Sequence, residues 1–234
     1  MEYLHWNEKS ITDLSDKNIT ELYDQGYVFT RIGKGVMHQT RSVRIDLSKF
    51  ELSSENRRIL KKIDGITLNV KDLPLADYTW KLGKTAKDFY DMKFGPSIMS
   101  TQKIKEMLTM PEKSNFNCLL EYTEPTKVAK SEKKTSLGFV ISYLNNEILH
   151  YSYPFYHIDI SPKDMGLGMM TFAIQHAKNS GMKYVYLGSL QRPSDTYKFQ
   201  FSGLEWFDGG PEGTQKWSTD TEKVKEILSH AFNI

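Results

Sequence analysis

The sequence of 234 residues contains a single cysteine, Cys118, and this scarcity excludes two kinds of structure. One cysteine cannot form a disulfide within the chain, and it cannot supply a metal site built on several thiolates. Six histidines are scattered without a ligand spacing such as HxxxH, so we expect no metal site. The nearest pair, His150 and His157, lies in a tyrosine-rich segment where a structural role is the simpler expectation.

The sequence also lacks an apolar run near the roughly 18 residues that can span a bilayer. The first ten residues, MEYLHWNEKS, contain no apolar core of the signal-peptide type. We therefore expect a soluble cytoplasmic protein with no membrane partner. Because 39% of the residues are apolar and 12% are aromatic, the chain can bury a core as one large domain or two small ones.

Familiar catalytic motifs are missing as well. No Ser-His-Asp or Cys-His set can be assembled with any specificity. The segment LGKT at 82–85 is similar to the end of a Walker A loop, but that motif needs a glycine at position 78, where Tyr78 stands. We therefore reject a P-loop nucleotide site.

The charges that are present are unevenly distributed. Residues 30–65 contain nine Lys or Arg against four Asp or Glu, which is a net charge of +5, and residues 201–234 contain three against six, which is −3. A basic N-terminal half suits phosphate or an acidic peptide, whereas an ordinary solvated face is the plainer explanation. On charge alone we favour the latter.

Periodicity and turn residues predict the secondary structure. Helices are expected at 11–26 with Leu14 and Leu22 on the apolar side, at 53–64, at 85–94 capped by Thr85, and at 101–110 capped by Ser100. From residue 116 the expected order is βββ-α-β-β-α, with a lysine-rich hairpin loop at 123–135. This order favours a mixed sheet flanked by helices, an α+β (α/β) fold. We expect a smaller N-terminal α/β portion at 1–115 and a C-terminal domain at 116–234.

Two segments carry chemical signals of their own. Lys163, Gly166 and Gly168 precede or open a helix, where backbone N–H groups can face a phosphate, although a tight loop that only starts a helix explains them equally well. In the segment YVYLG, Tyr184 and Tyr186 alternate with apolar residues, so both hydroxyl groups leave the sheet on the same face.

Taken in order, these segments resemble the aminoacyl-tRNA–protein transferase family, which includes the arginyl and leucyl transferases of the N-end rule. The matching residues cover about two thirds of the chain and are Gly26, Val43, Arg44, Phe50, Ser53, Arg57, Arg58, Leu167, Gly168, Ile174, Ala177, Gly181, Tyr184, Tyr186, Leu187, Gly188, Tyr197, Lys198, Phe201, Glu205 and Trp217. The chain departs from the family where Gln39, Thr40 and Arg41 replace paired cysteines, and where Ser42 replaces a proline.

The resemblance implies an N-acetyltransferase-like fold and the transfer of Arg or Leu from aminoacyl-tRNA to a protein α-amine, on acceptors with an acidic N-terminus and without a cofactor. It implies catalytic roles for Tyr184, Tyr186 and Lys198, which would orient the donor and meet phosphate or a developing oxyanion. A guanidinium fork suits an acceptor carboxylate or a tRNA phosphate, so the candidate substrate-binding residues are Arg41, Arg44 and Arg58, together with Tyr197 and Glu205. Alternatively, the tyrosines pack in the core and Lys198 lies on the surface.

Two other functions remain open from the sequence. The loop at 163–168 is similar to the R/Q-x-x-G-x-G/A loop of N-acetyltransferases, so an acetyl-CoA-dependent N-acyltransferase with Lys163, Gly166 and Gly168 on the pyrophosphate is the alternative. A non-enzymatic relative of the fold that binds peptide or RNA is the third possibility. The sequence does not specify the oligomeric state.

Overall fold

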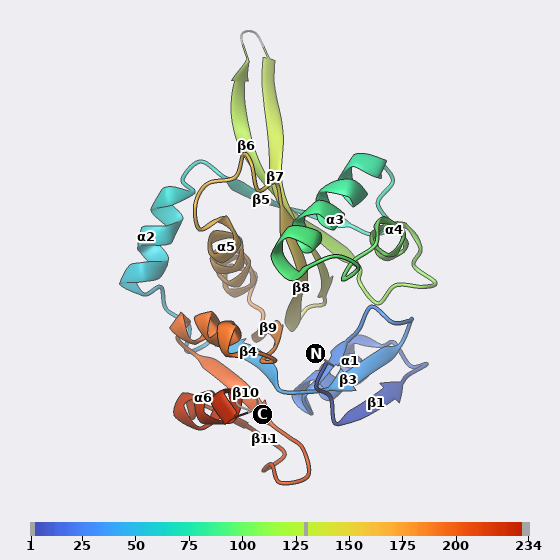
Figure 1. Ribbon diagram of the computed structural model, residues 1–234, viewed down its shortest axis with the longest axis vertical. Coiled ribbons are helices and arrows are strands. Elements are labelled where there is room, and N and C mark those ends of the chain that lie inside the picture. Colours follow the sequence, from blue (N-terminus) through green and yellow to red (C-terminus); the bar gives the residue numbers. More distant parts are fainter. Residues whose placement is uncertain (1–2, 129–130, 231–234) are drawn as a thin grey trace. The chain divides into compact units, whose positions relative to one another are not determined.

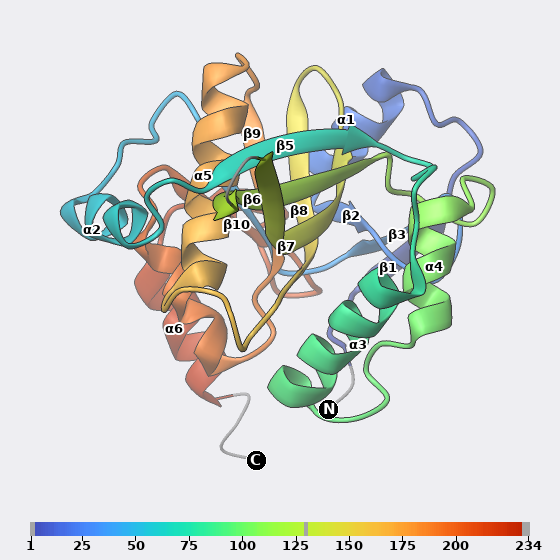
Figure 2. The same ribbon diagram turned by 90° about the horizontal axis from the view of Figure 1, so that it is seen from above.

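The computed structural model describes residues 3–128 and 131–230, and the chain forms two compact units. Residues 1–53, 145–150 and 177–234 make the first unit, and residues 54–144 and 151–176 make the second. Each unit has its own set of helices and strands (Figures 1 and 2). The first unit thus draws segments from both sides of residue 115, where we expected a boundary.

The first unit contains a small antiparallel sheet in the order β1-β3-β2 and one part of an eight-stranded mixed sheet. Its strands in the large sheet follow the order β11-β10-β4-β9-β8, and β8 and β9 are parallel. The elements are β1 (Asn7–Ser10), α1 (Asp16–Asp24), β2 (Tyr27–Phe29), β3 (Val36–Gln39), β4 (Ser42–Asp46), the start of β8 (Ile148–Tyr156), β9 (Tyr184–Ser189), the 3₁₀ helix η1 (Pro193–Gln200), β10 (Leu204–Asp208), β11 (Lys216–Ser218) and α6 (Thr221–His230).

The second unit contains the remaining strands of the large sheet, in the order β8-β7-β6-β5. Strands β6 and β7 form a long antiparallel hairpin, and helices α3 and α4 lie side by side (Figures 1 and 2). The predicted fold class, helices with a mixed sheet, is confirmed. The elements are α2 (Ser54–Lys62), β5 (Thr67–Asp72), α3 (Trp80–Phe94), α4 (Thr101–Thr109), β6 (Cys118–Val128), β7 (Ser131–Leu144), the end of β8 and most of α5 (Met165–Asn179).

Local signals explain where most helices begin and end. Ser15 caps α1 by accepting the Asn18 N–H, and Ser100 caps α4 by accepting the Lys103 N–H at 3.0 Å. The cap predicted at Ser100 is therefore confirmed. Gly26 follows α1 with φ +81°, the left-handed conformation that glycine adopts without strain.

Three sequence predictions are corrected. Leu14 lies before α1 and is exposed, so Ile19 and Tyr23 join Leu22 on the buried side. Helix α3 begins at Trp80, five residues before the predicted cap Thr85. Thr79 has the extended conformation of an N-cap, but its side chain makes no capping bond that would mark this start. Residues 123–128 and 131–135, expected in a loop, continue the paired strands β6 and β7, while 129–130 lie outside the described residues.

Within residues 3–128 and 131–230, no helix combines the length and the apolar character that a membrane-crossing segment needs.

Candidate functional site

Four polar or aromatic side chains form a row across adjacent strands of the first unit. His150 of β8 pairs with Tyr186 of β9, Tyr186 pairs with Arg44 of β4, and Arg44 pairs with Glu205 of β10. Side chains at directly paired positions lie on the same face of a sheet. Tyr184, two residues before Tyr186, joins the same face, as the alternation in the sequence predicts.

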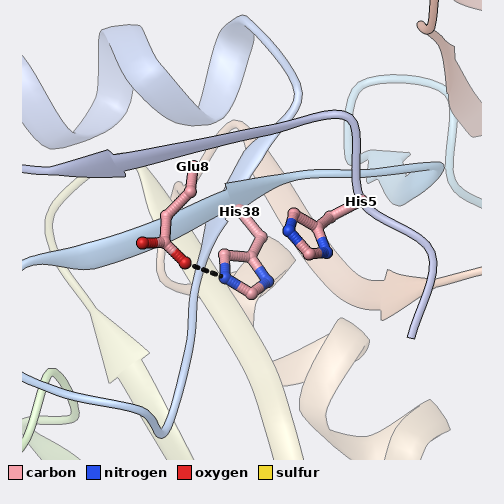
Figure 3. Close-up of side chains that lie close together, drawn as sticks. All are labelled: His5, Glu8 and His38. Carbon is pink, nitrogen blue, oxygen red and sulfur yellow. Dashed lines mark hydrogen bonds and ion pairs between the residues drawn. The ribbon is translucent and has the colours of Figure 1, made fainter. Parts of the chain in front are cut away.

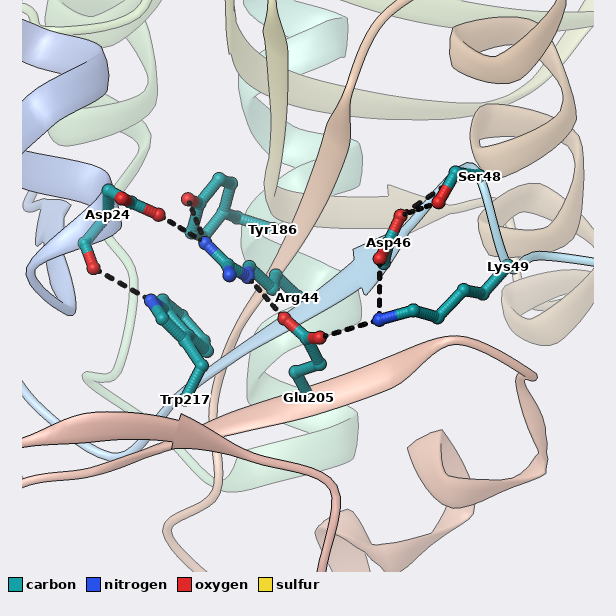
Figure 4. A network of polar contacts seen from close by, with 8 residues as sticks. All are labelled: Asp24, Arg44, Asp46, Ser48, Lys49, Tyr186, Glu205 and Trp217. Atoms are coloured by element: carbon teal, nitrogen blue, oxygen red, sulfur yellow. Dashed lines mark hydrogen bonds and ion pairs between the residues drawn. The ribbon is translucent and has the colours of Figure 1, made fainter. Parts of the chain in front are cut away.

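Arg44 lies at the centre of the row and is only 6% exposed. Its Nε donates to Glu205 Oε2 at 2.8 Å, and one terminal nitrogen donates to Asp24 Oδ1 at 2.6 Å and to the Tyr186 hydroxyl at 3.5 Å (Figure 4). The guanidinium is therefore shared between two carboxylates and a phenol. Charge-assisted bonds of this kind are about twice as strong as neutral ones.

Two aromatic rings enclose the same guanidinium. Its central carbon lies 3.9 Å from the ring centroid of Tyr184 and 4.0 Å from that of Trp217. Trp217 is held in turn by its indole N–H, which donates to the Asp24 carbonyl oxygen at 2.7 Å. A planar guanidinium can stack between two rings while it donates to two carboxylates, which a compact ammonium group cannot do, so the position suits arginine.

Glu205 is held from its other side as well. Its Oε1 lies 3.3 Å from Lys49 Nζ, and Lys49 also contacts Asp46 Oδ2 at 2.8 Å (Figure 4). The Asp46 carboxylate accepts from the Ser48 hydroxyl and from its N–H. The network thus extends from the buried row to the exposed Lys49.

The electrostatics of the row keep its charges in place. Burial opposes the charge on Arg44, but Tyr186, Asp24 and Glu205 raise its pKa above the usual value. Burial raises the pKa of Tyr186, and the neighbouring arginine offsets only part of that rise. Arg44 is therefore a cation and Tyr186 a neutral phenol near pH 7, so Tyr186 can donate a hydrogen bond but offers no anion.

Lys198 is buried at 6% exposure and does not lie on the surface. It belongs to η1, where a turn was expected, and its Nζ donates to the Ser189 carbonyl oxygen at 2.8 Å. Burial lowers the pKa of Lys198, and Asp195 counteracts part of that effect. Its neighbour Tyr197 is 47% exposed. A buried ammonium next to the end of β9 is a strong electrostatic group, because its field is poorly screened.

His150 connects the row to the core. Its Nδ1 lies 2.8 Å from the Tyr23 hydroxyl, which also accepts the Phe29 N–H, and the Tyr23 ring packs edge-on against Tyr186 at 4.8 Å. Burial, together with the charge of Lys198, lowers the pKa of His150 to about 3. His150 is therefore a neutral structural residue, as expected from the sequence.

Arg41 differs from Arg44 in having fewer partners. It is 9% exposed, one terminal nitrogen donates to the Leu190 carbonyl oxygen at 3.3 Å, and its buried Nε has no hydrogen-bond partner within residues 3–128 and 131–230. Burial lowers the pKa of Arg41, and Asp208 offsets part of the shift. Among the described residues, neither Arg41 nor Lys198 forms an ion pair, so both cations near the end of β9 have capacity for an anion.

The remaining predicted residues belong to the second unit. Lys163 is exposed, and a Cβ on Gly166 would lie 3.4 Å from the Tyr156 ring. A Cβ on Gly168 would lie 2.4 Å from Ile63 Cδ1, so close packing against the residue after α2 explains this glycine without a phosphate. Arg58 is exposed on α2 and pairs with Glu55.

Thiolate ligation of a metal does not fit this chain. The paired cysteines implied by the family resemblance are replaced near Arg41, and Cys118 is buried in β6, where its Sγ lies 3.5 Å from the Ser142 carbonyl oxygen. Burial raises the pKa of Cys118 to about 12, which keeps the thiol protonated.

Sequence reasoning did not identify Asp24, Tyr23 or His150 as members of this network. Trp217 was noticed only as part of the family resemblance. No local signal marks these residues, because their places follow from strand pairing and from the packing of α1 within the unit.

We predict that Arg44→Lys lowers the free energy of unfolding by about 2–4 kcal/mol, because one ammonium cannot reach both carboxylates and stack between two rings. The matched control is Arg58→Lys on α2, where the pair with Glu55 is exposed and the expected change is below about 0.5 kcal/mol. Urea denaturation followed by fluorescence measures both. Equal effects of the two substitutions would show that Arg44 has no special role.

We also predict an acid-sensitive contribution from His150. Its pKa is lower in the folded chain than its ordinary 6.5, so the unfolded chain binds more protons between pH 6.5 and about pH 3 and stability falls as the pH falls through that window. His150→Asn keeps a polar atom near Tyr23 but cannot titrate, so its stability should vary by a few kcal/mol less between pH 7 and 4. His230→Asn, an exposed position on α6, should retain the wild-type slope, and a wild-type slope in His150→Asn would contradict this prediction.

The chain is similar to curated proteins named aspartate/glutamate leucyltransferase. That of Alkalilimnicola ehrlichii is 28% identical over 213 residues, which cover 88% of this chain and 85% of the relative. The proteins of Ruegeria pomeroyi and Dinoroseobacter shibae are 26% and 27% identical, over 82% and 72% of this chain and 67% and 60% of their own lengths. The chain thus spans between 60% and 85% of these relatives.

Other comparisons add little. No protein-family model matches the chain. Among solved structures, L-PGS from Bacillus licheniformis has a TM-score of 0.43 and 16% sequence identity, and the match covers 80% of this chain and 59% of L-PGS. FemX has a TM-score of 0.44 and 9% identity, and the match covers 94% of this chain and 61% of FemX. Likeness this distant carries no argument, and the N-acetyltransferase-like fold stays a prediction. The curated relatives confirm the prediction of an acyltransferase and support the aminoacyl-tRNA–protein transferase family that the sequence motifs resemble.

Proposed function

We propose that the protein transfers leucine from aminoacyl-tRNA to the α-amine of proteins that begin with Asp or Glu. The observation that carries this proposal is the similarity to named aspartate/glutamate leucyltransferases over 88% of the chain. Those names favour leucine over arginine as the transferred residue. The proposal requires no cofactor, and its partners are an aminoacyl-tRNA and an acceptor with an acidic N-terminus.

The proposed reaction is aminolysis of an activated ester. The neutral α-amine of the acceptor attacks the carbonyl carbon of the aminoacyl ester, and a tetrahedral oxyanion forms. The bond to the ribose oxygen then breaks, a peptide bond remains, and the proton lost by the amine is transferred to the released ribose oxygen, which becomes a hydroxyl group. Because an α-amine has a pKa near 8, a useful fraction is neutral at pH 7, and holding both ends together supplies much of the rate.

Lys198 is the group that we assign to the oxyanion. It is a buried cation at the end of β9 with no ion-pair partner among the described residues, so its charge is available to an anion. Preorganised charge in a site shielded from water is worth more than the same charge in water. We assign to Tyr184 and Tyr186 the supporting role of shaping this face of the sheet, and to the exposed Tyr197 a contact with substrate.

We assign the acceptor carboxylate to Arg41 in preference to Arg44. Arg44 already binds Glu205 and Asp24, so it is a positioning residue. Arg41 has a buried Nε with no partner among the described residues, and a substrate carboxylate would satisfy it. The exposed Arg58 and Lys163 of the second unit are left for tRNA phosphates, which charged surface groups can bind.

The direct test is transfer of labelled leucine or arginine from charged tRNA to peptides that begin with Asp, Glu or Ala. We expect transfer of leucine to the Asp and Glu peptides only. Lys198→Met should lower kcat by about 10²–10³-fold through loss of oxyanion stabilisation, while Lys225→Met, an exposed lysine on α6, should leave it unchanged. Arg41→Met should mainly raise the KM for the acidic peptide, by about tenfold or more.

The outcomes separate the proposals. Absence of transfer from any charged tRNA, together with acetylation of the peptides from acetyl-CoA, would replace this function by the acetyl-CoA alternative. Transfer that persists at full rate in Lys198→Met would remove the role assigned to that lysine while leaving the activity itself intact.

A further inference from the structure

Two histidines and a glutamate meet in the small sheet of the first unit (Figure 3). Glu8 of β1 pairs across the sheet with His38 of β3, and Oε2 of Glu8 lies 2.8 Å from Nε2 of His38. His5, just before β1, stacks on His38 with the ring centroids 4.2 Å apart and the planes inclined by 15°. One ligand atom from each of the three residues lies within 4.8 Å of the other two.

The three side chains divide into one fixed and two adjustable groups. His38 is only 6% exposed, and its buried Nδ1 has no hydrogen-bond partner in the described part of the chain. His5 and Glu8 are exposed, so both can rotate without disturbing the core. Nδ1 of His5 lies 3.3 Å from the Tyr3 carbonyl oxygen, and donation to that oxygen leaves Nε2 with the lone pair that a metal takes.

We propose that His5, Glu8 and His38 bind a divalent transition-metal ion of the zinc class. Imidazole nitrogens suit zinc, copper and nickel, whereas magnesium and calcium prefer oxygen ligands throughout. Two histidines with one carboxylate form a recognised zinc ligand set that leaves a fourth position for water. Small rotations of the two exposed side chains bring the ligand atoms to the closer spacing that a bound ion requires.

The site is independent of the proposed transfer reaction, and its expected effect is on the stability of the first unit. Strand β3 leads directly through Thr40 and Arg41 into β4, which carries Arg44. A metal held by His5 and His38 would tie the segment before β1 to β3, close to the connection through Thr40 and Arg41 into β4. Histidine spacing along the chain could not reveal the site, because its members come together only through the β1–β3 pairing.

Zinc binding to the tag-free, full-length protein tests the proposal. After treatment with EDTA and removal of the chelator, Zn²⁺ is titrated by calorimetry and in competition with a chromogenic chelator. We expect one saturable site per chain, a higher melting temperature with Zn²⁺, and Co²⁺ absorption bands typical of nitrogen and oxygen ligands without a thiolate charge-transfer band.

Variants locate the site. His5→Gln and Glu8→Gln change exposed residues and should fold normally, and each should weaken Zn²⁺ binding by about tenfold or more. His230→Gln removes an exposed histidine on α6 and should bind like the wild type. No saturable binding up to about 100 μM Zn²⁺, or binding that is unchanged in both His5→Gln and Glu8→Gln, would overturn the proposal.

Discussion

Burial of the Arg44 guanidinium is the constraint on which the rest of the first unit depends. A charge removed from water costs several kcal/mol unless hydrogen bonds and opposite charges surround it. Glu205 on β10, Asp24 at the end of α1 and two aromatic rings provide that environment. Separate parts of the chain must therefore come together around one residue. If β4 paired with β9 or β10 in a different register, the guanidinium of Arg44 would be buried without these partners.

The same constraint separates two kinds of cation in this unit. Arg44 is paired with two carboxylates of the protein, whereas among the residues that the structure describes Arg41 and Lys198 donate only to the carbonyl oxygens of residues 190 and 189. The first kind organises the fold, and the second kind is suited to an anionic substrate or intermediate. Internal pairing, and not burial alone, thus distinguishes the two kinds of cation.

Most elements could be predicted from the sequence because their signals are local. The cap at Ser100 and the alternation of Tyr184 and Tyr186 with apolar residues each act within a few residues. The row from His150 to Glu205 could not be predicted, because it depends on the register of strands that lie far apart in sequence. The sequence predicts too late a start for α3, because the side chain of Thr79 makes no capping bond that would mark the true start. It predicts strands β6 and β7 that are too short, because the lysines near their ends are typical of a solvated loop.

The most direct measurement of the central claim is a double-mutant cycle with Arg44→Met and Glu205→Gln, read by chemical denaturation. If the buried pair holds β4 to β10, the coupling free energy should be about 1.5 kcal/mol or more, because each single variant leaves a buried partner unsatisfied and the double variant does not. A coupling near zero, with additive single effects, would contradict the claim that Arg44 is bound internally by Glu205.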